Sequence, residues 1–167
     1  WGQREKQDLS KLVSLVPHAK VTGNPRFDLL HPRFRKTWMK EELKIKREYG
    51  DFVLFTSRFS AGNHFRRSLT QTVDRRKQQY AGRAGESLPQ RLKLLDRLLA
   101  DYVSVIGATA TRFRDVRFIV RPHPMENAAL WEACFANCSN VMIRRDGTAV
   151  PWLSAARCVI HNCCTTG

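Results

Sequence analysis

The sequence of 167 residues lacks several features that would place it in a special class of protein. It contains no run of about 18 apolar residues, the length at which a segment becomes a candidate membrane-spanning helix. It has no recognisable secretory signal peptide, no internal repeat and no low-complexity tract. What remains is an ordinary globular composition, in which 43% of the residues are hydrophobic and can supply a core.

Cysteine is scarce, and its pattern argues against disulfide bonds. The five cysteines are Cys134, Cys138, Cys158, Cys163 and Cys164. An odd number with two neighbours is a poor disulfide framework, so we expect unpaired thiols in a reducing, cytoplasmic compartment. Cys134 and Cys138 have the helical spacing of a zinc ligand pair, but no second clean pair follows. We therefore expect no metal and no cofactor.

Acidic residues are also few, which leaves a formal net charge of +14. Residues 1–100 hold 22 basic residues against 10 acidic ones, and residues 101–167 hold 7 against 5. Such an excess suggests nucleic acid, an anionic membrane surface or a phosphorylated substrate as a partner, or simply solvated charged faces. A nucleic-acid-binding module stays an alternative. We expect no nucleic acid, because the aromatic residues lie in apolar runs rather than among Lys and Arg.

From residue 51 onward, short apolar runs alternate with helical patterns. The predicted strands cover residues 51–57, 117–121, 140–144 and 158–161, and the predicted helices cover about 65–80, 87–106, 125–137 and 149–157. This alternation predicts an α/β fold with a mostly parallel sheet and helices on both faces. Trp131 and Trp152 are expected to pack between helices and sheet.

The first 50 residues give a weaker pattern. We expect a helix within residues 1–16, a short strand at 19–22, a turn at 23–25, and a helix over 33–48 that Gly50 ends. Residues 1–50 are interpreted as an interdomain junction, formed by a linker and a helix, and residues 51–167 as an incomplete domain.

Polar and cationic side chains follow three of the predicted strands directly. The three segments are 56–63, 121–127 and 161–167. Ligands of an open parallel sheet bind where the strands end, so these segments are expected to converge on one site. Arg58 comes from the first segment, Arg121 and His123 from the second, and His161 from the third.

Two of these segments have a direct chemical interpretation. Thr165, Thr166 and Gly167 would expose backbone N–H groups at a strand-to-helix turn, which suits a diphosphate, although Thr also begins many ordinary helices. His123 lies between two prolines that stiffen its loop, and its imidazole could hydrogen-bond a phosphate or act as a general acid. The alternative for the loops is a solvated surface.

Several segments together resemble bacterial surface-polysaccharide biosynthesis proteins of the GT-B glycosyltransferase type, which have two Rossmann-like domains. The matching segments are VTGNPRFDLL, YGDFVLFTSRF, RFIVRPHPMEN and DGTAVPWLSAARCVIHNCCTTG. The VTGN segment is also similar to that of nucleotide-sugar 2-epimerases, and RPHP to that of CDP-glycerol glycerophosphotransferases. The basic stretch 66–85 matches neither.

The resemblance implies that residues 51–167 are an incomplete nucleotide-binding, Rossmann-like domain. The donor diphosphate would lie against Thr165, Thr166 and Gly167, near His123 and Arg121 and with Arg58 and His161 close by. The partners would be a nucleotide-activated sugar donor and a saccharide or lipid-linked acceptor, at the inner face of the membrane. The likeness also implies a missing N-terminal domain, so this fragment alone is expected to be inactive. A nucleotide-sugar 2-epimerase is the alternative enzyme.

Overall fold

The centre of the structure is a four-stranded parallel sheet. The computed structural model describes residues 2–10, 20–24, 28–29, 31–60, 62–64 and 88–162. The strands are β1 (Phe52–Thr56), β2 (Arg117–Arg121), β3 (Val141–Ile143) and β4 (Cys158–His161), in the order β3-β2-β1-β4. All three strand pairings are parallel. The predicted strands and the α/β class are confirmed.

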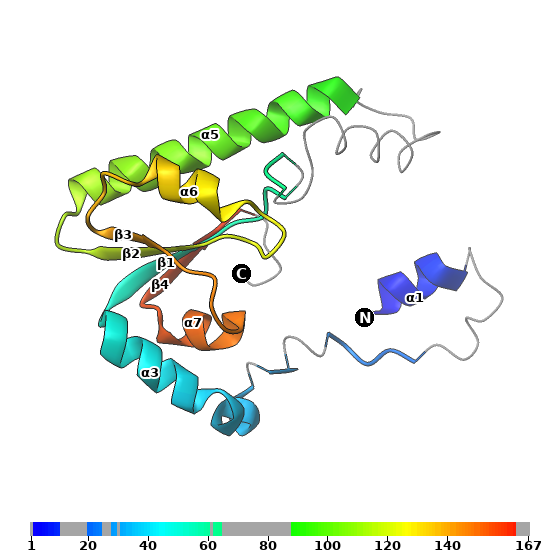
Figure 1. Cartoon of the computed structure of the whole chain (residues 1–167). Coiled ribbons are helices and arrows are strands. Elements are labelled where there is room, and N and C mark those ends of the chain that lie inside the picture. The colour runs from blue at the N-terminus through cyan, green and yellow to red at the C-terminus, as the bar shows by residue number, and fades with distance from the viewer. Residues whose placement is uncertain are drawn as a thin grey trace.

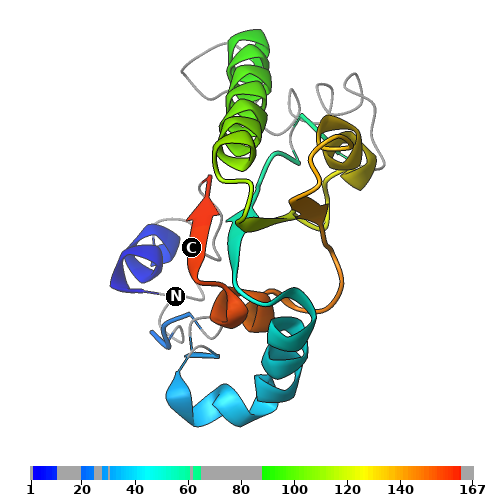
Figure 2. The ribbon, with the colours of Figure 1, turned by 90° about the vertical axis from the view of Figure 1, so that its left-hand side faces the viewer.

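Helices cover both faces of the sheet. On one face lie α5 (Leu88–Arg112) and α6 (Ala128–Cys134), and on the other α3 (Met39–Tyr49) and α7 (Ala149–Ala155) (Figure 1). Figure 2 shows the same separation from the side, with the sheet between the two pairs. Because α5 and α6 precede β2 and β3 while α7 precedes β4, the chain changes face between β3 and β4.

Alternating side chains of the strands build one core on each face. The α5–α6 core contains Phe55, Ile106, Phe118, Val120, Trp131 and Phe135. The α3–α7 core contains Ile45, Tyr49, Phe52, Leu54, Ile119 and Trp152. Trp131 is 0% exposed and Trp152 is 1% exposed, so the prediction that both pack between helices and sheet is confirmed.

Helix α3 is part of the sheet's own packing. Ile45 and Tyr49 lie in the α3–α7 core, next to Phe52 of β1. Gly50 ends the helix at a φ of +62°, a conformation that glycine adopts without strain. The domain boundary at residue 50 stays a prediction.

Several local predictions needed correction. The helix expected over 33–48 is divided into a 3-10 helix, η2 (Pro32–Thr37), and α3. No strand forms at residues 20–22, and the early helix, α1, covers Gln3–Ser10. Helix α6 begins later than expected because Asn127 caps it, its side chain accepting a hydrogen bond from the N–H of Ala129. The helix expected at 65–80 lies outside the described residues.

Candidate functional site

The ends of β2, β1 and β4 bring three polar side chains into one row. The register pairs Thr56 with Arg121 on one side and with His161 on the other. Partners in a parallel register point to the same face, which here is the face of α3 and α7. Thr56 is only 4% exposed, and its hydroxyl has no hydrogen-bond partner among the described residues. A buried hydroxyl without a partner is uncommon, so its place at the carboxyl edge of the sheet marks that edge as a candidate site.

Strands β1 and β4 form the point where the chain topology reverses. The strand after β1 lies on one side of it, and β4 lies on the other, with their helices on opposite faces. In open α/β sheets this arrangement leaves a crevice beyond the strand ends, which is where ligands bind. We use the name β1–β4 crevice for this switch point, the position beyond the carboxyl ends of β1 and β4 between Arg58 and Asn162.

A hydrogen bond joins the two sides of this crevice. The backbone N–H of Arg58 donates to Oδ1 of Asn162 at 2.9 Å. Just below, the Tyr102 hydroxyl of α5 lies 2.9 Å from the carbonyl oxygen of Thr56 and 3.1 Å from that of Ile160. The Arg58 side chain is exposed and forms no hydrogen bond or ion pair with a described residue. Its guanidinium is therefore free to meet an anion.

The guanidinium of Arg121, in contrast to that of Arg58, is bound to backbone carbonyl groups of the described chain. It donates to the carbonyl oxygens of Asp146 at 2.7 Å and Gly147 at 2.6 Å, and it lies 5.5 Å from the centre of the Trp152 ring. Burial lowers the pKa of Arg121, but an arginine stays charged at neutral pH. Arg121 thus holds the turn after β3, and two of its donors are already used.

His123 lies in the turn after β2 with one ring nitrogen fixed. Its Nδ1 accepts a hydrogen bond from the N–H of Met125 at 3.2 Å. A nitrogen that accepts carries no proton, so the neutral ring bears its proton on Nε2. The imidazole as a whole is half-buried.

Glu126 was not among the residues selected from the sequence. Its residue is 0% exposed, and its carboxylate accepts hydrogen bonds from Ser57, Phe59, His123 and Trp131. Burial raises the pKa of Glu126, while the hydrogen bonds oppose that change. No sequence signal identified it, because a single glutamate in a loop is usually solvated.

Further contacts fasten the loop after β1 to the loop after β2. Asn63 donates from its side chain to the carbonyl oxygen of Asn127 at 3.1 Å, and the N–H of Asn127 donates to the carbonyl oxygen of Asn63 at 3.1 Å. His64 forms an antiparallel bridge with Glu126. These two loops therefore form one body beside the crevice.

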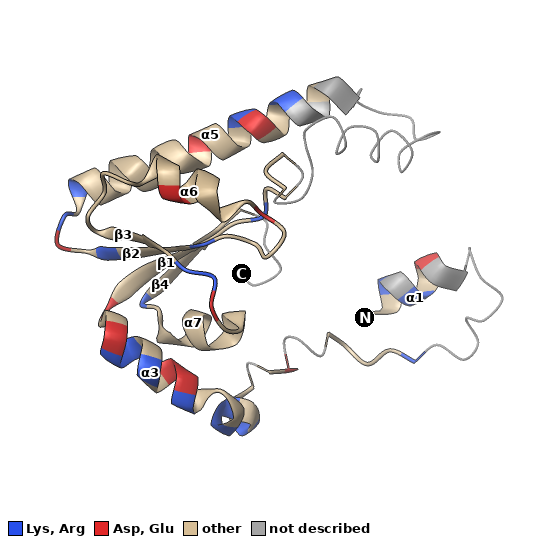
Figure 3. Ribbon diagram, viewed as in Figure 1, with Lys and Arg blue, Asp and Glu red and all other residues tan. Residues whose placement is uncertain are grey.

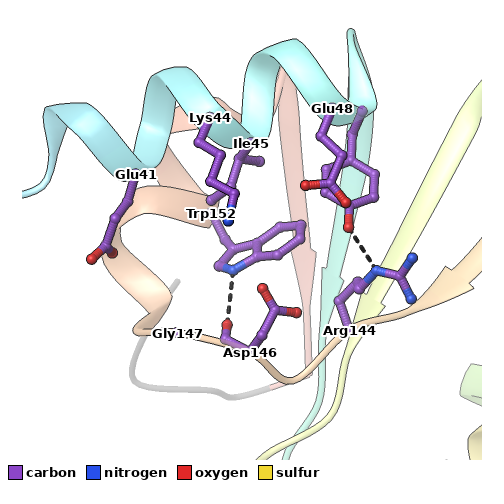
Figure 4. A pocket seen from close by; sticks show the side chains of 9 residues that line it. Glu41, Lys44, Ile45, Glu48, Arg144, Asp146, Gly147 and Trp152 are labelled. Carbon is purple, nitrogen blue, oxygen red and sulfur yellow. Dashed lines mark hydrogen bonds between the residues drawn. The ribbon is translucent and has the colours of Figure 1, made fainter.

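A separate cavity of about 580 Å³ opens between α3 and the turn after β3 (Figure 4). Its lining residues are Glu41, Lys44, Ile45, Glu48, Tyr49, Arg144, Asp146, Gly147 and Trp152. Nε of Arg144 donates to the Tyr49 hydroxyl at 2.8 Å, and Nε1 of Trp152 donates to the carbonyl oxygen of Asp146 at 3.1 Å. Both signs of charge line it, so it shows no preference for an anion.

The other predicted site residues have different outcomes. His161 ends β4 and is exposed, at the rim of the β1–β4 crevice. Thr165, Thr166 and Gly167 lie outside the described residues, so the predicted phosphate turn stays a prediction. Arg58 follows β1, His123 follows β2 and His161 ends β4, and these three strands are adjacent in the sheet. The convergence of their side chains on one site stays a prediction.

Three of the five cysteines lie in the part of the chain that the structure describes. The thiols of Cys134, Cys138 and Cys158 are free. Within residues 2–10, 20–24, 28–29, 31–60, 62–64 and 88–162, no three side chains of His, Cys, Asp or Glu come together as a metal site. No helix in that part of the chain is both long and apolar enough to cross a membrane.

Comparisons with known proteins give no identification. No family model, no curated protein and no solved structure matches this chain.

Proposed function

We propose that this chain contributes the nucleotide-binding part of a glycosyltransferase-like enzyme of surface-polysaccharide biosynthesis. The observation that carries the proposal is the β1–β4 crevice. Arg58, whose exposed guanidinium has no hydrogen-bond or ion-pair partner among the described residues, and the exposed imidazole of His161 lie at this point, and His123 follows the adjacent strand β2. Cationic and N–H-donating groups at a topological switch point suit a diphosphate.

The strand order of the sheet supports the same proposal. The strand order β3-β2-β1-β4, with helices on both faces, corresponds to the strands 3-2-1-4 of the Rossmann order 3-2-1-4-5-6, which include its switch point. We assign the chain to the nucleotide-binding domain of a GT-B enzyme, acting in the cytoplasm at the inner face of the membrane. The resemblance in four sequence segments supports this assignment.

The chemistry would be transfer of a sugar or phosphosugar from a nucleotide-activated donor. The bond between the donor group and the leaving phosphate oxygen breaks, and a bond to an acceptor hydroxyl of a saccharide or lipid-linked acceptor forms. The hydroxyl proton passes to a base. The leaving group is the nucleoside diphosphate when a sugar is transferred, and the nucleoside monophosphate when a phosphosugar is transferred. Arg58 and His161 would offset the charge that develops on the leaving phosphate, and Nε2–H of His123 would donate a hydrogen bond to it.

Thr56 and Arg121 take supporting roles in this proposal. The hydroxyl of Thr56, which has no partner in the described part of the chain, belongs to the strand residue that pairs with Arg121 on one side and His161 on the other. Arg121 fixes the turn at Asp146 and Gly147, which borders the same edge. We therefore place Arg58 ahead of Arg121 as the arginine that meets the donor phosphates.

Charge alone does not favour the nucleic-acid alternative. Along α3, Lys40, Lys44, Lys46 and Arg47 alternate with Glu41, Glu42 and Glu48 (Figure 3). Such a mixed helix surface gives no continuous basic stripe for a phosphate backbone. Steep salt-dependent binding to random DNA would nevertheless support that alternative over ours.

Titration calorimetry with UDP, GDP, CDP and dTDP tests the proposal. One of the four is expected to bind, and Arg58→Ala is expected to weaken that binding about tenfold, the usual effect of losing one charge-assisted hydrogen bond. Arg114→Ala is the matched control, because Arg114 is exposed and precedes β2 at the opposite edge of the sheet. The proposal fails if none of the four binds, or if both variants change affinity equally.

Product analysis separates transferase from epimerase. Incubation of the full-length enzyme with a UDP-N-acetyl sugar and no acceptor should leave the sugar unchanged. Formation of the 2-epimer would assign the epimerase function instead.

A further inference from the structure

We infer that Glu126 is a positioning residue, whose buried carboxylate holds the loop after β1 against the loop after β2 and so orients Arg58, which follows β1 beside the β1–β4 crevice, and His123, which follows the neighbouring strand β2. This inference rests on the proposed function for its ligand. The geometric part rests on four hydrogen bonds to one side chain.

Each oxygen of the carboxylate has two donors. Oε1 accepts from the N–H of Phe59 at 2.8 Å and from the N–H of His123 at 3.3 Å. Oε2 accepts from the Ser57 hydroxyl at 2.9 Å and from Nε1 of Trp131 at 3.1 Å. One carboxylate therefore connects the loop after β1, the loop after β2 and helix α6. A shift of either loop would leave buried donors without an acceptor.

The carboxylate has no cationic partner among the described residues. The ion pairs of this part of the chain involve Glu42 and Asp51, and none involves Glu126. All four donors to Glu126 are neutral groups. A buried charge held only by neutral groups is weak as a source of stability, but it demands a specific arrangement of its donors. The feature that Glu126 controls is therefore the relative position of the loops.

Both candidate ligand-binding side chains depend on this arrangement. Arg58 lies between Ser57 and Phe59, which both donate to Glu126, and its own N–H is held by Asn162. His123 is held through its backbone N–H, and its Nδ1 is held by Met125 within the same turn. The direction of the Nε2–H bond is thus fixed by the turn that Glu126 closes.

Glu126→Gln gives a sharp test because it keeps the shape of the side chain. A glutamine has one acceptor oxygen, and its NH₂ group would face the indole N–H of Trp131, which cannot accept. Glu132→Gln is the matched control, since Glu132 is exposed on α6, the helix that follows Glu126, and its substitution removes the same charge. Circular dichroism checks that both variants are folded.

The readouts are the His123 ring nitrogens by ¹H–¹⁵N NMR and the affinity for the nucleoside diphosphate that the wild type binds. We expect the wild type and Glu132→Gln to show His123 with its proton on Nε2. In Glu126→Gln we expect a mixture of tautomers, a shifted Phe59 amide and about tenfold weaker binding. A role limited to stability would change none of these in a folded variant.

The outcomes separate this inference from the proposed function. If the wild type binds no nucleoside diphosphate, the proposed function fails, while the NMR comparison still decides whether Glu126 orients the loops. If the wild type binds and folded Glu126→Gln keeps the same affinity and the same His123 spectrum, the inference is overturned. If Glu126→Gln does not fold, Ser57→Ala removes a single donor, and an unchanged His123 spectrum and affinity in that variant overturns the inference as well.

Discussion

The loop after β1 is joined to the loop after β2 and to the end of β4 in different ways. Towards β2, it is joined by the fully buried carboxylate of Glu126 and by two hydrogen bonds between Asn63 and Asn127, one of them from the Asn63 side chain. Towards β4, beyond the strand ends, the described residues are joined by one hydrogen bond from Arg58 to the Asn162 side chain. The first junction is thus held by buried hydrogen bonds to one carboxylate, whereas the second is held by a single exposed one. A ligand that binds at the carboxyl edge would therefore have to break fewer contacts on the β4 side than on the β2 side.

The largest expected effect comes from removing the junction with the loop after β2. Glu126→Ala leaves four buried or half-buried donors without their acceptor and creates a cavity between β1, β2 and α6. We expect the free energy of unfolding to fall by about 3 kcal/mol, as measured by urea denaturation. If the free energy of unfolding fell by less than about 0.5 kcal/mol, water would be replacing the carboxylate as the acceptor for these donors.

The pH dependence of this junction has a definite sign. Burial raises the pKa of Glu126 above its ordinary value of 4.5, so the folded protein binds this proton more tightly than the unfolded chain does. The contribution of Glu126 to stability is thus fully present below pH 4.5 and is lost as the pH rises through the folded-state pKa. The stability of the wild type minus that of Glu126→Gln should fall over this range in urea titrations. If the stability of the wild type relative to Glu126→Gln grew with pH instead, the raised pKa of Glu126 would be contradicted.

Arg121→Met tests the turn that borders the crevice. The substitution removes hydrogen bonds to Asp146 and Gly147 but keeps an unbranched side chain near Trp152. We expect a loss of about 1–2 kcal/mol in the free energy of unfolding and a smaller loss of nucleotide affinity than in Arg58→Ala. If Arg121→Met lost more affinity than Arg58→Ala, while remaining folded, Arg121 would be the principal phosphate ligand.

The smallest effect on stability is expected at the junction with the end of β4. Asn162→Ala removes one partly exposed hydrogen bond to the N–H of Arg58, and water can replace it. The expected change in the free energy of unfolding is about 0.5 kcal/mol. Hydrogen exchange at the Arg58 amide should accelerate, while exchange at the Phe59 amide stays slow. Equal acceleration at both amides would mean that the two junctions open together.

The sequence predicts the sheet well and the junctions poorly, for physical reasons. Strands such as β1 are short apolar runs, and the direct succession of polar residues at their ends marks the carboxyl edge. The Glu126 junction depends on contacts between Ser57 and Glu126, which are 69 positions apart. No local pattern records such a contact, and nothing in the sequence distinguishes a buried glutamate from a solvated one.

The two arginines show the same limit. Arg58 follows one apolar strand and Arg121 ends another, and both are predicted phosphate ligands, with Arg121 next to the diphosphate and Arg58 facing it from the first loop. In the structure Arg121 turns to the carbonyl oxygens of Asp146 and Gly147, 25 and 26 positions away, whereas Arg58 is exposed. Helix α3 is similar, since the packing of Ile45 and Tyr49 with Trp152 becomes visible only once β1 and α7 are placed side by side.

The central claim is that the β1–β4 crevice binds the diphosphate of a nucleotide. The most direct measurement is a ¹H–¹⁵N NMR titration of the protein with the nucleoside diphosphate that binds. We expect the largest shifts at the amides of Arg58, His123 and Asn162, and little change at Arg114 on the opposite edge of the sheet. Shifts confined to the cavity between α3 and the turn after β3, at Lys44 and Asp146, would contradict the claim.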